Sequence, residues 1–258
     1  MLIDTHTHLY SSKFDEDREA VIQDCLNNDI LKLLLPNIDS EYTDSMLALA
    51  KKHPTVCYPM MGIHPCSIQP DTYKAELAHA KEWLEKGNFI AIGEIGIDLY
   101  WDKTTLAIQQ EAFREQISWA KEKQLPIVIH ARDSFDEIFE IVDEMNDENL
   151  TGIFHCFTGN QKQAQHIVDY GGFKMGIGGV VTFKNAGLDK VLSQYDLSHF
   201  VLETDSPYLA PAPHRGKRNE SPYLTLIGEK MADIYGCSLT EIAEVTTKNA
   251  LEIFNLGE

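Results

Sequence analysis

Two histidines near the start of the chain, His6 and His8, are spaced for metal binding. They follow a short apolar segment, Leu2 and Ile3, that predicts a strand. Side chains on a strand alternate between its two faces, so both imidazoles should project to the same side. Neutral imidazoles on one rigid segment can form half of a metal site. Such a pair also arises by chance, and one histidine could be a ligand-free polar residue at the strand end.

Further residues that can bind metal ions stand at equivalent positions along the chain. Each ends an apolar run that we predict to be a strand: Glu94, His130, His155 and Asp205. Gathered at one end of a parallel sheet, these groups and the first two histidines would repel one another and lose hydration unless cations lay between them. Each residue alone could be a satisfied polar group of the core. The six together exceed the needs of one tetrahedral ion with an open position, so they predict a site for two ions.

The order of the predicted elements indicates how these residues could be brought together. Apolar strand-like runs alternate with amphipathic helical stretches, which is typical of a parallel sheet of β-α units. Strands are predicted from Leu2 and at residues 30–35, 56–61, 89–94, 126–130, 152–155, 173–177 and 200–205. Helices are predicted at 15–28, through 46–50, at 73–85, 105–123 and 135–145, and from Ser221 and Ser238. Ser134 and Glu137 fit a capping box for the helix at 135–145.

Eight predicted strands within 258 residues match an α/β fold, a (β/α)8 TIM barrel, with a single domain over residues 1–258. In such a barrel the carboxyl ends of the strands form the active-site face, which is where the six polar residues fall. A doubly wound open sheet is the alternative. It would call for a glycine-rich phosphate-binding turn after the first strand, and His6 and His8 stand there instead.

The composition is that of an ordinary globular protein, with 43% hydrophobic and 24% charged residues. No apolar run approaches the roughly 20 residues of a membrane span. The chain starts directly with a strand rather than a signal peptide, so we expect a cytoplasmic protein without membrane contact. Five cysteines without a Cys-x-x-Cys pair indicate neither a disulfide framework nor a zinc knuckle. The sequence leaves the oligomeric state open, and a monomer is compatible with it.

The formal net charge of −18 opposes long-range attraction to nucleic acid. A nucleic-acid substrate is compatible with this charge if bound cations and a local basic loop hold it, and binding should then be weak and metal-dependent. The loop at 211–219 carries Arg215, Lys217 and Arg218. Arg132, two residues after His130, could grip an anion with two guanidinium nitrogens. Such charged loops are as often only solvated.

Other residues near the predicted active-site face have less defined roles. His64 follows the third strand and could point into the barrel mouth. Tyr100 and Trp101 follow the fourth strand, where they could stack a nucleobase or form a packed lid. Several other histidines fall on predicted helices or connections and are expected at the surface, at positions 53, 79, 166 and 199.

Several sequence blocks resemble the TatD family of metal-dependent deoxyribonucleases. They are residues 4–9 (DTHTHL), 93–98 (GEIGID), 129–133 (IHARD), 155–159 (HCFTG), 203–209 (ETDSPYL), 213–219 (PHRGKRN) and 247–250 (TKNA). The blocks keep the family's order and cover nearly the whole chain, which makes the resemblance specific. Leu99 stands where many relatives have an aromatic residue, and Thr158 where many have serine. These departures weaken the case for base stacking rather than for metal binding.

The resemblance implies a TIM barrel that hydrolyses phosphodiesters, commonly by 3′-to-5′ exonuclease action on DNA. It implies that one divalent ion is held by His6, His8, Glu94 and Asp205. A second ion would be held by His130 and His155, with Glu94 bridging the two. The ligand types favour zinc or manganese, because magnesium prefers oxygen and water, although relatives are often described as magnesium-dependent.

We therefore predict a divalent-metal-dependent phosphodiester hydrolase, a deoxyribonuclease that uses a metal-activated water at a dinuclear site. Asp205 and Glu94 are the predicted catalytic residues, with Asp205 orienting or deprotonating the water. The residues predicted to bind substrate phosphates are His64, Arg132, Arg215, Lys217 and Arg218. The competing class is an amidohydrolase-type lactonase, amidase or deaminase, because one barrel can host several chemistries. A non-enzymatic metal-binding module is the third alternative. The basic loop discriminates, since a neutral amide or lactone gives no reason to collect three cations.

Overall fold

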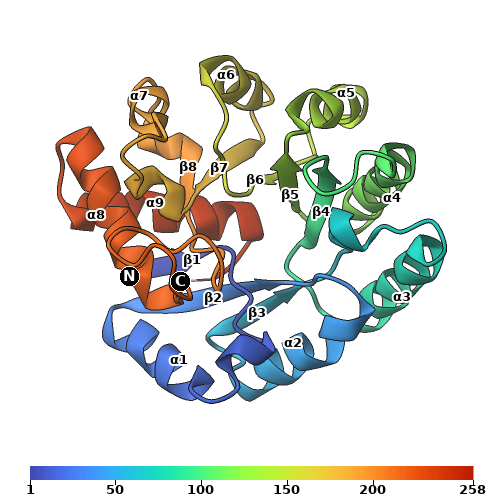
Figure 1. Ribbon diagram of the computed structural model, residues 1–258, viewed down its shortest axis with the longest axis horizontal. Helices are drawn as coiled ribbons and strands as arrows, with labels where there is room; N and C mark the ends of the chain where they lie inside the picture. The colour runs from blue at the N-terminus through green and yellow to red at the C-terminus, as the bar shows by residue number, and fades with distance from the viewer. Residues whose placement is uncertain (258) are drawn as a thin grey trace.

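The computed structural model describes residues 1–257, in which parallel strands at the centre are surrounded by helices (Figure 1). The strands are β1 (Leu2–Asp4), β2 (Ile30–Pro36), β3 (Cys57–Met60), β4 (Ile92–Asp98), β5 (Ile127–Arg132), β6 (Gly152–Phe154), β7 (Phe173–Ile177) and β8 (Phe200–Leu202). The α-helices are α1 (Arg18–Asn27), α2 (Ser40–Lys52), α3 (Tyr73–Lys86), α4 (Leu106–Lys123), α5 (Phe135–Met145), α6 (Gln161–Asp169), α7 (Leu188–Leu192), α8 (Leu224–Tyr235) and α9 (Leu239–Phe254). Short 3-10 turns are η1 (Ser12–Phe14), η2 (Pro65–Ser67), η3 (Gly179–Thr182), η4 (Leu197–His199) and η5 (Ser221–Tyr223).

The strands follow one another in chain order, and every neighbouring pair is parallel. Within residues 1–257 they form a sheet of β1 to β3 and a sheet of β4 to β8. Isolated bridges join the sheets at both seams, from Met61 to Ile92 and from Thr7 to Ser206. The Thr5 N–H also donates to the Leu202 carbonyl at 3.1 Å. The predicted (β/α)8 architecture is confirmed.

Apolar side chains from strands around the ring fill its interior. Ile3, Leu34, Val128, Ile153 and Val201 belong to one buried cluster. Two residues of α9, Ala250 and Phe254, also belong to this cluster. The barrel is therefore a packed core rather than a pore, and the chemistry must lie at the ends of the strands. No helix in residues 1–257 combines the length and the apolar character that crossing a bilayer requires.

The fourth strand lies further along the chain than predicted, at Ile92–Asp98 instead of 89–94. Ile95 and Ile97 are fully buried and continue the strand beyond Glu94. Glu94 therefore lies within β4, and Asp98 ends it. In contrast, β1 and β8 end earlier than predicted, at Asp4 and Leu202. Their metal-binding candidates lie on the segments that leave the strands and not on the strands themselves.

The helices after β1 to β5 lie close to their predicted positions, although α1 begins at Arg18 rather than at 15. The capping box predicted for α5 is wrong. Ser134 Oγ instead donates to the Ile97 carbonyl at 2.6 Å and accepts the Arg132 N–H at 3.1 Å, so it ties β4 to β5. The helices α6 and α7 were not predicted, because α6 is mostly polar and α7 has only five residues.

Candidate metal centre

Histidines and carboxylates meet at the carboxyl ends of the strands. One group of possible ligand atoms within 4.8 Å of one another comes from the segments after β1 and β8: His6, His8 and Asp205. A second such group comes from β4, β5 and the segment after β3: His64, Glu94 and His130. The imidazole centroids of His6 and His8 lie 5.1 Å apart, so these two rings do share one side. His155, after β6, stacks on His6 with a centroid distance of 3.5 Å and so lies between the groups.

The carboxylate of Glu94 lies at the centre of the cluster, and its two oxygens face different imidazoles. Oε2 is 3.1 Å from Nε2 of His6 and 3.8 Å from Nε2 of His8. Oε1 is 2.7 Å from Nδ1 of His130 and 3.7 Å from Nε2 of His155. This division is the arrangement that a carboxylate bridging two ions requires.

Electrostatics favour the charged form of the central carboxyl groups. Burial by itself opposes a charge on Glu94, but the nearby imidazoles of His64 and His6 outweigh it and hold the pKa of this carboxyl well below its ordinary value. Burial also opposes a charge on Asp205, yet its hydrogen bond with His8 and the charge of His155 lower its pKa. Both groups are therefore ionised at neutral pH and can act as ligands for cations.

His8 is held in an orientation suited to metal binding. Its Nδ1 lies 2.7 Å from the Tyr10 hydroxyl, and that hydroxyl donates its hydrogen to the Pro36 carbonyl. The Tyr10 oxygen must therefore accept a hydrogen from Nδ1 of His8. The Nε2 lone pair is left facing Asp205 Oδ1 at 3.6 Å and Glu94. A fixed partner on one ring nitrogen is the usual setting of a histidine ligand.

His130 is held in the same way, but by a carboxylate. Its Nε2 lies 2.9 Å from Oδ2 of Asp98, and its Nδ1 faces Glu94. A proton on Nε2 can be donated to Asp98, which leaves Nδ1 free for an ion. Burial alone would raise the pKa of Asp98, but the hydrogen bond from His130 and the other interactions of this carboxylate together outweigh it and lower this pKa to about 2. Asp98 is therefore a permanent negative charge behind His130.

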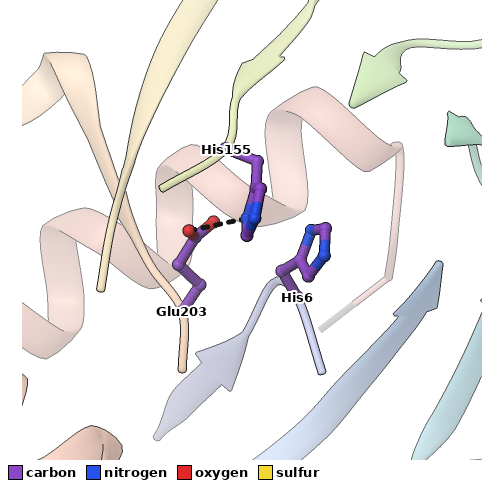
Figure 2. Close-up of side chains that lie close together, drawn as sticks. All are labelled: His6, His155 and Glu203. Atoms are coloured by element: carbon purple, nitrogen blue, oxygen red, sulfur yellow. Dashed lines mark ion pairs between the residues drawn. The ribbon is translucent and has the colours of Figure 1, made fainter. Parts of the chain in front are cut away.

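Glu203, on the segment after β8, lies beside His155, and His155 in turn lies next to His6 (Figure 2). Its Oε1 is 2.8 Å from Nδ1 of His155, at an angle outside hydrogen-bond geometry. Within residues 1–257, Nδ1 of His6 and Oε2 of Glu203 also have no hydrogen-bond partner, although all three residues are buried. A Cβ at position 176 would lie 2.1 Å from Glu203 Oε2, so only glycine on β7 leaves room for this carboxylate.

Two histidines of the cluster, His155 and His130, have raised pKa values. Burial by itself opposes a charge on His155, but Glu203 and Glu94 outweigh it and raise its pKa to about 10. Burial likewise opposes a charge on His130, yet Asp98 and Glu94 raise its pKa. Divalent cations would supply the same positive charge directly to the ligand atoms. The donor set, with its orphaned buried nitrogen and oxygen atoms, thus fits metal ions.

His64 differs from the other histidines of the mouth. Its Nδ1 accepts the Cys66 N–H at 3.1 Å, so in the neutral ring the proton lies on Nε2. Burial is the main cause that lowers its pKa to about 3, so the ring is neutral at physiological pH. Nε2 faces Oε1 of Glu94 at 3.5 Å. Nε2 is therefore a hydrogen-bond donor rather than a metal ligand.

The predicted phosphate-binding cations occupy different settings. The guanidinium of Arg132, on β5, lies 3.8 Å from the Tyr100 ring centroid, and that of Arg215 lies 4.0 Å from the Phe183 centroid. Both side chains and that of Lys217 are exposed. Arg218 is engaged within the chain, where it donates to Asp17 at 2.6 and 2.9 Å and to Glu220 at 2.9 Å.

The histidines that were expected at the surface lie half-buried on the outside of the barrel. His53 pairs with Glu19, and His166 with Asp143, at 3.2 and 2.8 Å. His79 contacts the Thr43 hydroxyl at 3.0 Å. His199 lies in η4. These positions are separate from the metal centre.

Three residues that contact the predicted ligands were not predicted from the sequence: Tyr10, Asp98 and Glu203. A signal for all three was present. Asp98 lies four residues after Glu94, Glu203 two residues before Asp205 and Tyr10 two residues after His8, and even spacing on an extended chain places side chains on one face. The contact of Tyr10 with Pro36 had no such signal, because it depends on the path of the chain after β1.

The fold and the cluster of histidines and carboxylates together define a metal-dependent hydrolase of the TIM-barrel class. The sequence profile of the family described as "TatD related DNase" matches residues 3–255. The chain is 37% identical to the "uncharacterized metal-dependent hydrolase YabD" of Bacillus subtilis, over 100% of both chains. It is 31% identical to the "uncharacterized metal-dependent hydrolase YcfH" of Escherichia coli K12, over 99% of this chain and 96% of that one.

A solved structure agrees with these sequence comparisons. The crystal structure of YjjV, a TatD homologue from Escherichia coli K12, is 28% identical and has a TM-score of 0.90, with 99% of this chain and 98% of that chain covered. The chain belongs to the TatD family, as the sequence blocks predicted.

Proposed function

We propose that this protein is a divalent-metal-dependent phosphodiesterase that acts on nucleic acid, with DNA as the expected substrate. The observation that carries the proposal is the pairing of a histidine–carboxylate centre with the exposed cations Arg132 and Arg215, in a protein with a net charge of −18. Such cations favour an anionic substrate at this mouth. The family relationship supports the same substrate class.

Two ions fit the charge of the cluster. Glu94, Asp98, Glu203 and Asp205 carry four negative charges when ionised, which two divalent ions would balance with every imidazole neutral. One ion would be held by His6, His8, Glu94 and Asp205. The other would be held by Glu94, His130 and His155. When bound, such ions supply Lewis acidity and lower the pKa of a coordinated water. Zinc and manganese suit the nitrogen-rich donors best, and magnesium remains part of the test.

The side chains of the centre have separable tasks. Asp205 is 13% exposed, whereas the side chains of His6 and Glu94 are at most 3% exposed. Asp205 therefore reaches furthest towards solvent of these three and is placed to orient a water and accept its proton. His64, with its proton on Nε2, is suited to donate to a phosphoryl oxygen. Glu94 keeps the two halves of the centre together.

The exposed cations contribute to substrate binding rather than to the centre. Arg132 can contact a phosphate with two nitrogens, and Arg215 and Lys217 are exposed and can contact neighbouring phosphates. Arg218 is left out of this set, because its guanidinium is occupied by Asp17 and Glu220. With so few cations available, binding of DNA should be weak and sensitive to salt.

The experiment that tests this function is a comparison of substrate classes. The purified protein is stripped of metal, reloaded with zinc, manganese or magnesium, and assayed on single-stranded DNA, bis(p-nitrophenyl) phosphate, and panels of lactones and amides. We expect turnover of both phosphodiesters and its loss on chelation. Turnover of lactones or amides without turnover of either phosphodiester would contradict the proposal and favour the amidohydrolase-type alternative. Failure to hydrolyse any of them would favour a binding module.

A further inference from the structure

Exposed apolar side chains gather at the barrel mouth. Among residues 1–257, the exposed large apolar residues include Tyr100 and Trp101 after β4, and Tyr208 and Leu209 after β8. Tyr100 is 53% and Trp101 71% exposed. These two aromatic residues therefore do not form a packed lid. Single exposed apolar side chains are common, but adjacent ones that form a contiguous patch can mark a ligand or partner site.

The two rings are arranged so that the indole stays open. Their centroids are 4.9 Å apart and their planes meet at 89°, so the rings pack edge to face and do not cover each other. The Arg132 guanidinium lies 3.8 Å from the Tyr100 centroid and 5.5 Å from the Trp101 centroid. A positive charge thus lies directly beside an exposed aromatic surface.

This aromatic pair is fixed relative to the metal centre by one carboxylate. Oδ1 of Asp98 accepts the N–H groups of Tyr100 and Trp101, at 3.0 and 3.3 Å. Oδ2 of the same residue holds His130. Arg132 is the register partner of Asp98 across the β4–β5 pair. The aromatic surface, the cation and a predicted metal ligand are therefore parts of one rigid unit.

An open cleft adjoins this unit. It has a volume of about 660 Å³ and is lined by Tyr100, Arg132, Ser134, Thr158 and Gln163 among others. That volume lies within the roughly 300–1,000 Å³ of small-ligand sites. A nucleotide has the matching chemistry, because its base offers an aromatic face and its phosphate offers a negative charge.

We propose that Tyr100, Trp101 and Arg132 form a platform that stacks an unpaired nucleobase of the substrate beside the metal centre. This inference rests on the proposed function and refines its substrate to nucleic acid with unpaired bases. A base inside a duplex is stacked on both faces and has no face to offer. The platform therefore selects single-stranded or frayed ends, and it tolerates any base because every base has a π-face.

The test compares a short DNA oligonucleotide with one of equal length in which tetrahydrofuran abasic residues replace every nucleoside. The metal-loaded wild-type protein is expected to favour the base-bearing oligonucleotide by about 5- to 160-fold in kcat/KM, which corresponds to about 1 to 3 kcal/mol for stacking one base. Trp101→Ala should remove most of that preference through KM, and Trp101→Phe should retain it. Leu31→Ala, which removes an exposed apolar side chain near the amino end of β2, is the matched control and should behave like wild type.

A binding measurement separates the platform from the proposed function. Trp101 is far more exposed than the buried Trp119, so a base stacked on it should quench its fluorescence. The base-bearing oligonucleotide, with phosphorothioate linkages to slow cleavage, is expected to quench wild type and not Trp101→Phe, whereas the abasic one quenches neither. Equal quenching by both oligonucleotides, or an unchanged preference in Trp101→Ala, would overturn the platform. If no phosphodiester is cleaved, the proposed function fails and the quenching result alone decides the platform.

Discussion

The two halves of the metal centre hold their histidines with different partners. In the half formed after β1 and β8, the Tyr10 hydroxyl accepts from His8. In the half formed by β4 and β5, the Asp98 carboxylate faces His130. A neutral partner fixes the orientation of a ring, whereas a carboxylate also raises its basicity and its affinity for cations. The partner of His8 therefore fixes only the orientation of its ring, whereas the partner of His130 fixes the orientation of its ring and also strengthens its binding to cations.

The largest effect is expected where the halves meet, at Glu94. We predict that Glu94→Gln loses more than about 100-fold in kcat/KM, beyond the usual loss for a residue that only supports a ligand. An amide cannot supply two anionic oxygens, so both ions should bind more weakly. His155→Ala should chiefly empty one site. Elemental analysis and activity assays provide the measurement.

The control for this change is Glu76→Gln, which alters a carboxylate that accepts hydrogen bonds from Ser40 outside the centre. It should retain two ions and full activity. If the Glu94→Gln protein also keeps two ions at wild-type occupancy, the bridging role is refuted.

A matched pair of variants tests whether the two halves of the metal centre bind their ions independently. Asp98→Asn removes the charge behind His130, and we expect the affinity for one ion to fall by about 10- to 100-fold. Tyr10→Phe removes a neutral hydrogen-bond partner of His8, which contributes about 1 kcal/mol, so the affinity for the other ion should fall about fivefold. Titration calorimetry of the metal-free proteins measures both. Equal losses at the same ion in both variants would show that the halves are not independent.

The pH dependence of metal binding follows from the histidines proposed to hold the second ion, His130 and His155. The pKa of His155 is raised to about 10, so this ring carries a proton in the metal-free protein at pH 7, and the pKa of His130 is also raised. An ion must displace the proton of His155, so binding should release at least one proton. Affinity should therefore rise with pH until about pH 10, by about tenfold per unit for each proton displaced.

The raised pKa of His155 also affects the stability of the metal-free folded state, which falls as the pH rises, whereas the affinity for metal increases. The raised pKa of His155 stabilises the folded state below pH 6.5, and this contribution is lost as pH rises through about 10.

Titration calorimetry of metal binding, in buffers of different ionisation enthalpy, counts the protons that are released when an ion binds. A count of zero at pH 7 would show that the imidazoles are already neutral without metal.

The smallest effects are expected at the outer cations, where the exposed Arg215 packs on Phe183 and Arg218 is paired with carboxylates. We predict that Arg215→Ala raises KM for DNA a few-fold and makes the slope of log affinity against log salt shallower by about 0.7 to 0.9. Arg218→Ala should instead lower the melting temperature, because Asp17 and Glu220 lose their shared partner. A change of salt slope in Arg218→Ala alone would reverse these assignments.

The parts of the fold and of the metal centre that depend on local sequence patterns could be predicted, and those that depend on contacts between distant residues could not. The alternation of apolar runs and helices, and polar residues near the strand ends, was enough to predict the barrel and to bring His6, His8, Glu94 and His130 together. The exact end of β4 was not predictable, because the prediction stopped at the first charged residue and so excluded Asp98. The pairing of Arg218 with Asp17 joins residues 201 positions apart and depends on the folded path of the chain.

We expect one carboxylate, Glu94, to join two metal ions that the two halves of the centre hold separately. The most direct test is a crystal structure of the manganese- or zinc-loaded protein in which anomalous scattering locates the ions. We predict two ions per chain, one oxygen of Glu94 on each, with His8 bound through Nε2 and His130 through Nδ1. A single ion, or Glu94 in contact with only one of two, would contradict this account.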